Sequence, residues 1–66
     1  MTIECRRYIE SARNIQLPIA RIQALAGCIS VIREMSDSEA EELVNTLIRE
    51  AIVEHNRNLK DMVFDD

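Results

Sequence analysis

The sequence has little of what builds turns, strands and aromatic surfaces: its 66 residues include one glycine, one proline, one tyrosine, one phenylalanine and no tryptophan. Few glycines and prolines disfavour a fold of many short strands and a disordered, low-complexity chain. Few aromatic rings weaken the case for binding single-stranded nucleic acid, because bases stack on such rings. The residues that are common, Leu, Ile, Ala, Glu and Arg, favour helices. The sequence therefore predicts an all-α protein.

Residues that carry out chemistry are also scarce. His55 is the single histidine, and Cys5 and Cys28 are too far apart for a CxxC pair. The acidic stretch 37–42 has no glycine-centred loop, so it is not a calcium site. No Ser–His–Asp or Cys–His arrangement follows from local spacing. We therefore expect no catalytic residue, no metal and no cofactor, and two reduced thiols in a cytoplasmic protein.

Long hydrophobic runs are missing as well. The most apolar stretch, residues 18–32, contains Arg21 and Gln23 and is shorter than the about 20 residues that span a bilayer. The net charge of −4 argues against general affinity for nucleic acid or for anionic membranes. The charge is uneven, because residues 1–33 carry five Arg and two Glu while residues 34–66 carry three basic and ten acidic residues. We expect the two halves to attract each other, although a basic face for a polyanion stays an alternative.

The clearest helix signal lies in residues 36–64. Ser36 followed by Glu39 has the spacing of a capping box, in which each residue satisfies an amide of the first turn. Apolar residues then recur three and four positions apart, which places them along one side of a helix. They include Leu43, Leu47, Ile48, Ala51, Ile52, His55 and Leu59. This stripe requires a partner surface.

Two further helices are expected before it, over residues 1–16 and 18–34, in a single domain 1–66. Pro18 fits the first turn of a helix, where its missing N–H costs nothing. However, apolar residues keep the same spacing across Pro18, so one kinked helix is the alternative. They occupy positions 5, 8, 12, 15, 19, 22, 26 and 29. The short turn before Ser36 predicts that the last two helices fold back as an antiparallel hairpin with an N-terminal helical extension.

The hydrophobic content predicts self-association. It reaches 47%, which is more apolar surface than a helical hairpin of this length hides by itself. We therefore expect a homodimer with a four-helix-type bundle. Its expected core and dimer contacts are Ile19, Ile22, Ala26, Ile29, Leu43, Leu47, Ile48, Ala51, Ile52 and His55. Gly27, in the middle of a helix, is expected to let another backbone approach closely.

Several short motifs resemble the phycobilisome-degradation protein (NblA) family over residues 15–64. Ile15-Gln16-Leu17-Pro18 is similar to the family's opening I-x-L-(S/T), and Met35-Ser36 is similar to its Met-Ser turn. Ala40, Leu47, Arg49 and Val53 fall where the family tends to have these residue types, without a gap. Ala20-Arg21 replaces the family's Glu-Gln pair, and Leu59-Lys60 matches its Leu-Leu-Lys segment only after a two-residue shift. Residues 1–14 lie outside the resemblance.

The resemblance implies a helical-hairpin dimer that acts as a non-enzymatic adaptor. Such an adaptor binds phycobiliproteins and brings them to a Clp-type chaperone-protease during nutrient starvation. The resemblance implies target contacts at Arg49, Leu59 and Lys60. Two other functions stay open. One is a small dimeric RNA-binding hairpin, which would use Arg6, Arg7, Arg13, Arg21 and Arg33. The other is a small inhibitor or antiactivator, such as a phage-borne one, that lays an apolar helix face on one target.

Overall fold

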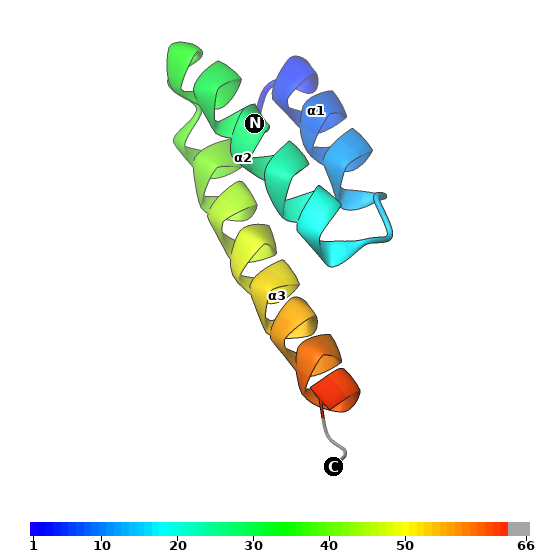
Figure 1. The fold of residues 1–66 in the computed structure, drawn as a ribbon. Helices are drawn as coiled ribbons and strands as arrows, with labels where there is room; N and C mark the ends of the chain where they lie inside the picture. The colour runs from blue at the N-terminus through cyan, green and yellow to red at the C-terminus, as the bar shows by residue number, and fades with distance from the viewer. Residues whose placement is uncertain (64–66) are drawn as a thin grey trace.

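The protein forms three α-helices in the computed structural model, which describes the backbone of residues 1–63 and the side chains of residues 1–59. Helix α1 runs over Ile3–Arg13, α2 over Pro18–Glu34 and α3 over Ser38–Val63. α2 and α3 form an antiparallel hairpin, and α1 packs mainly on α2 and also on α3 (Figure 1). Residues 1–63 contain no strand. The predicted all-α class is confirmed.

Two separate helices, and not one kinked helix, lie on either side of the segment before Pro18. α1 ends at Arg13, and Leu17 has extended backbone angles of −76° and 123° before α2 begins at Pro18. A proline disfavours helical geometry in the residue before it, so Leu17 is extended and the chain reverses between Arg13 and Pro18. α1 therefore lies beside α2 and not in line with it (Figure 1).

The side chain of Arg21 binds the loop between α1 and α2 by hydrogen bonds. Its Nε donates to the backbone oxygen of Ile15 at 2.8 Å, and its Nη2 donates to the backbone oxygen of Gln16 at 2.9 Å. Its Nη1 lies 3.0 Å from Glu54 Oε1 on α3. The half-buried side chain of Arg21 thus joins the loop, α2 and α3.

The turn between α2 and α3 differs from the predicted one. Ser36 has a φ of 54°, its N–H donates to Arg33 O at 3.1 Å, and the N–H of Asp37 donates to Ile32 O at 3.2 Å. These two bonds form a Schellman motif, so Ser36 ends α2. The prediction that Ser36 caps α3 is wrong. Asp37 caps α3 instead, since its Oδ1 accepts from the N–H of Ala40 at 3.2 Å.

Replacing Ser36 by Gly is expected to stabilise the protein. A positive φ of 54° strains any side chain with a Cβ, and glycine is the usual residue at this position. We expect the free energy of unfolding to rise by about 0.5–1 kcal/mol. Urea unfolding followed by circular dichroism measures it. Ser38→Gly, two residues later within α3, is the control and should destabilise; a lower stability of Ser36→Gly would contradict the assignment of the turn.

The core lies where the three helices meet. Its buried residues are Cys5, Ile9, Ala12, Leu25, Cys28, Ile32, Ala40 and Val44. In α1 the spacing rule chose the wrong residue, because Tyr8 is 51% exposed while Ile9 is 1% exposed. Tyr8 was favoured because positions 5, 8, 12 and 15 have three-four spacing that also continues into α2, as in one kinked helix. Once the chain reverses, α1 presents Cys5, Ile9 and Ala12 to α2 and α3.

The molecule is elongated. Its radius of gyration is 13.5 Å, whereas a compact domain of 66 residues has about 11 Å. α3 extends beyond the start of α2, so its last turns have no helix beside them (Figure 1). Among residues 1–63, no helix combines the length and the apolar character that a membrane span requires.

Candidate protein-interaction surface

α2 carries two apolar rows on different sides. The first row, Pro18, Leu25, Cys28 and Ile32, is buried in the protein. The second row, Ile19, Ile22, Ala26 and Ile29, also has three-four spacing but remains accessible. Ile19 is 49% exposed, Ala26 is exposed, and Ile22 and Ile29 are half-buried. A helix that is apolar on two sides is normally packed on both, so the second row is unusual for an isolated chain.

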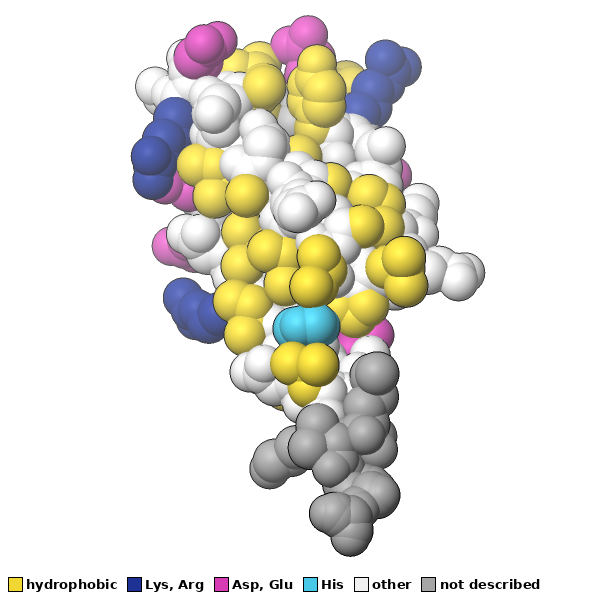
Figure 2. Space-filling model, in the orientation of Figure 1, with side chains coloured by type: hydrophobic (Ala, Val, Ile, Leu, Met, Phe, Trp, Pro, Cys, Tyr) yellow, Lys and Arg dark blue, Asp and Glu magenta, His cyan; other side chains and the backbone are white. Residues whose placement is uncertain are grey.

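α3 contributes a second accessible row. Ile52 is 43% exposed and Leu59 is 44% exposed, while Ile48 and His55 are half-buried. We call the two rows together the open face: Ile19, Ile22, Ala26, Ile29, Ile48, Ile52, His55 and Leu59. Figure 2 shows the histidine side chain within a broad area of hydrophobic side chains. α1 lies on the other side of the hairpin, against Ala24 and Leu43.

The open face ends in an apolar cleft, the end cleft, at the start of α2. Its volume is about 360 Å³. It is lined by Leu17, Pro18, Ile19, Ala20, Gln23, His55, Asn58 and Leu59. An apolar lining with a few polar groups is typical of sites that bind organic groups, and this volume suits a few side chains of a partner. Leu17, 71% exposed, stands at its edge.

The structure describes the side chains of two of the three predicted target contacts, and it places these two apart. Leu59 lines the end cleft. Arg49 is exposed and lies ten residues earlier in α3, about 15 Å along the helix axis, so it is not part of the cleft. The Lys60 side chain lies outside the described residues. Of the two predicted contacts whose side chains the structure describes, Leu59 has an apolar site around it and Arg49 does not.

The predicted core and dimer residues fall into two groups. Ala51 is buried, and Leu43 and Leu47 are half-buried against the core of the single chain. The remaining seven residues lie on the open face, and two of them, Ile29 and Ile48, also pack against the core: Ile19, Ile22, Ala26, Ile29, Ile48, Ile52 and His55. Helical spacing identified both groups but did not separate them, because α2 is apolar on both sides.

The two halves of the chain are joined by charge, as their opposite net charges predict. Arg21 pairs with Glu54 at 3.0 Å, and Arg33 pairs with Glu41 at 3.4 Å. Two of the five first-half arginines are therefore engaged within the protein. Arg6, Arg7 and Arg13, on α1, are exposed. The five arginines therefore do not form one basic surface, because the two on α2 are paired with glutamates of α3.

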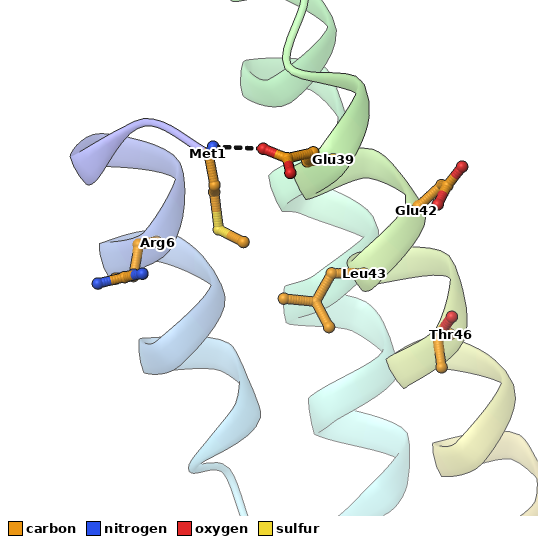
Figure 3. A pocket seen from close by; sticks show the side chains of 6 residues that line it. All are labelled: Met1, Arg6, Glu39, Glu42, Leu43 and Thr46. Carbon is orange, nitrogen blue, oxygen red and sulfur yellow. Dashed lines mark hydrogen bonds and ion pairs between the residues drawn. The ribbon is translucent and has the colours of Figure 1, made fainter.

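A second groove, between α1 and α3, has charged walls. Its volume is about 540 Å³, and it is lined by Met1, Arg6, Glu39, Glu42, Leu43 and Thr46. The Met1 ammonium group lies 2.7 Å from Glu39 Oε1, and this hydrogen bond raises the pKa of the amino group (Figure 3). Arg6 and Glu42 point away from this pair in opposite directions (Figure 3). The groove therefore holds an internal ion pair and no converging set of catalytic groups.

A neighbouring hydrogen bond attaches the first residues to the turn. The N–H of Thr2 donates to Asp37 Oδ2 at 2.7 Å, which lowers the pKa of this carboxyl group. Asp37 thus receives one hydrogen bond from the start of α1 and one from α3. Together with the Met1–Glu39 pair, it holds the beginning of the chain against the start of α3.

The two cysteines belong to the core. Cys5 and Cys28 are buried free thiols, and the Sγ of Cys5 lies 3.7 Å from Met35 Sδ. Burial raises the pKa of the Cys28 thiol, which keeps it protonated and weakly nucleophilic. Within the part of the chain that the structure describes, no three Cys, His, Asp or Glu side chains come together as metal ligands.

Comparison with known proteins assigns no family: no family model, no curated protein and no solved structure matches the chain.

Proposed function

We propose that this protein is a cytoplasmic, non-enzymatic adaptor that works as a homodimer and binds a target protein. The observation that carries the proposal is the open face, where Ile19, Ile52 and Leu59 are 49%, 43% and 44% exposed. Large apolar areas on soluble proteins mark interaction sites, because leaving them in water is unfavourable. A surface of this kind suits a binding protein.

The two parts of this surface have different tasks in the proposal. The middle of the open face serves self-association, and the end cleft with the adjoining last turns of α3 serves the target. Support comes from the position of Leu59, which is 44% exposed at the wall of an apolar cleft. Interfaces depend on a few apolar anchors that fill such sites. Leu59 is the proposed anchor.

The proposed target class is a phycobiliprotein, brought by this adaptor to a Clp-type chaperone-protease. This specific target rests on the resemblance of residues 15–64 to the phycobilisome-degradation protein family. The antiparallel hairpin of α2 and α3 and the accessible Leu59 suit such a role. Arg49 lies too far along α3 to share the cleft, so in this proposal it contacts a separate part of the target.

Capture from an extract tests the proposed target. Immobilised protein exposed to a phycobilisome-containing extract should retain phycobiliprotein, identified by mass spectrometry and absorbance. Leu59→Ala should reduce the retained amount about 10-fold or more, since it removes the apolar anchor. Val53→Ala is the matched control, because Val53 is 56% exposed on a different side of α3.

Other outcomes of this capture decide against the proposed target. An equal loss with Val53→Ala would mean that Leu59 has no special role. Retained RNA, lost with the α1 arginines, would indicate the RNA-binding function. Retention of one unrelated protein that dissociates the dimer would indicate an inhibitor. Retention of nothing would remove the adaptor function for phycobiliproteins.

A further inference from the structure

We propose that Leu17 is a second anchor of the end cleft, besides Leu59, and that Arg21 is the positioning residue that holds Leu17 in place. This inference rests on the proposed function, in which the end cleft binds the target. Leu17 belongs to the loop before α2 and Leu59 belongs to α3, so the two leucines come from different walls of one cleft. We call these two leucines the clamp.

The side chain of Leu17 contributes little to the core. It is 71% exposed, and Ile19 and Leu59, which line the same cleft, are 49% and 44% exposed. A single exposed leucine is common on proteins, but three large apolar side chains around one cleft are the pattern of a binding site. Shortening Leu17 therefore removes little from the fold, whereas a ligand in the cleft loses a contact.

The backbone that carries Leu17 is held by one residue. Arg21 donates to three consecutive carbonyl groups: Nε to Ile15 O at 2.8 Å, Nη2 to Gln16 O at 2.9 Å, and the backbone N–H to Leu17 O at 2.9 Å. Pro18 adds a further restriction, because it disfavours helical geometry at Leu17, whose ψ is 123°. Leu17 thus projects from a loop whose backbone is fixed.

The side chain of Arg21 also sets this loop against the α3 wall of the cleft. Its Nη1 lies 3.0 Å from Glu54 Oε1, and Glu54 directly precedes His55, which lines the cleft. Arg21 therefore fixes Leu17 relative to α3. A loop that is ordered before binding loses less conformational entropy when a ligand binds, and this raises the affinity.

The lining indicates what kind of group fits between the two leucines. Among the described residues of the cleft none is Asp, Glu, Lys or Arg, so a charged group would lose its hydration without gaining a partner. The polar side chains of the lining are Gln23, His55 and Asn58, and two of them carry amides, which donate and accept hydrogen bonds as a peptide group does. The occupant is therefore an uncharged apolar side chain of the target protein, together with the peptide groups beside it.

A minimal ligand tests the clamp without the target. N-acetylphenylalanine amide has one apolar side chain, no charge and a peptide group on each side. In an NMR titration of the full chain, its addition should shift the methyl signals of Leu17 and Leu59. Leu17→Ala should raise its dissociation constant about 5-fold or more, because an anchor is lost. Ile3→Ala is the matched control, since Ile3 is 74% exposed on α1 and does not line the cleft.

A double-mutant cycle tests the positioning role of Arg21. Arg21→Met should weaken binding of the same ligand about 3-fold or more, because the loop then has to become ordered on binding. In the Leu17→Ala background the same change should cost nothing further, since Arg21 acts through Leu17. A general loosening of the structure would weaken binding equally in both backgrounds, and this result would overturn the role of Arg21.

A relaxation measurement on the wild type keeps the test decisive if Arg21→Met does not fold. The order parameter of the Leu17 amide should be close to about 0.85, the value of rigid backbone, and a value below about 0.6 would overturn the inference. Unchanged Leu17 signals in the titration, or equal affinities of Leu17→Ala and the wild type, would overturn it as well.

The clamp and the proposed target fail in different ways. Binding of the minimal ligand between the two leucines, without capture of phycobiliprotein from an extract, would reject the proposed target and keep the clamp. Capture of phycobiliprotein that Leu17→Ala leaves unchanged would keep the target and reject the clamp.

Discussion

Replacing Ile32 by Ala is expected to lower the free energy of unfolding by about 2–5 kcal/mol. Ile32 has no exposed surface and packs within the cluster that joins all three helices. The substitution removes apolar atoms and leaves a cavity that the helices fill only in part. The core of a domain of this size rarely supplies more than about 3–5 kcal/mol in total. We therefore expect Ile32→Ala to be largely unfolded at room temperature.

Urea unfolding followed by circular dichroism measures this loss, at one fixed protein concentration because self-association contributes to stability. Ile3→Ala is the matched control: the same residue type is 74% exposed in the first turn of α1. We expect it to change stability by about 0.5 kcal/mol or less. Equal losses for the two variants would contradict the location of the core.

Arg21→Met is expected to lower the free energy of unfolding by about 1.5–3 kcal/mol. The side chain of Arg21 is 19% exposed and serves three partners: two backbone oxygens of the loop before α2, and Glu54 on α3. Methionine keeps the apolar stem but leaves the oxygens of Ile15 and Gln16 without their donor. The loop should then release the end of α1 from α2.

Chemical denaturation of two control variants separates the causes. Arg33→Met removes an ion pair of 3.4 Å whose arginine is 69% exposed, so its expected loss is about 0.5 kcal/mol or less. Glu54→Gln removes the charge that faces Arg21 but keeps both bonds to the loop, so it should cost less than Arg21→Met. If Arg21→Met were as mild as Arg33→Met, the loop would not depend on Arg21.

Helix positions were predictable from sequence because their signals are local. Apolar spacing and Pro18 located α2 and most of α3 within two residues. The helix cap was not predictable by the same rule, since Ser36 and Asp37 both suit a cap. The choice depends on how α2 ends: its Schellman motif puts Ser36 in left-handed geometry, which leaves Asp37 to cap α3.

The relation between the helices required the structure. Tyr8 and Ile9 are neighbours, and only the reversal of the chain at Pro18 decides which of them is buried. The two apolar rows of α2 look alike in sequence, so spacing does not tell which one faces α1 and α3. The role of Arg21 could not be predicted from the sequence either, because its partners belong to the preceding loop and to α3. Most residues of the open face were predicted as core or dimer contacts, but the sequence did not show which of these contacts are buried within one chain and which stay accessible.

One NMR measurement tests the central claim most directly: intermolecular NOEs in a mixture of isotope-labelled and unlabelled chains. A second copy on the open face predicts NOEs between molecules at the methyl groups of Ile22, Ala26 and Ile52, and none at Val53, on a different side of α3. If intermolecular NOEs are absent at concentrations where the chain is folded, or if they arise at Val53 and not at Ala26, the proposed interface is wrong.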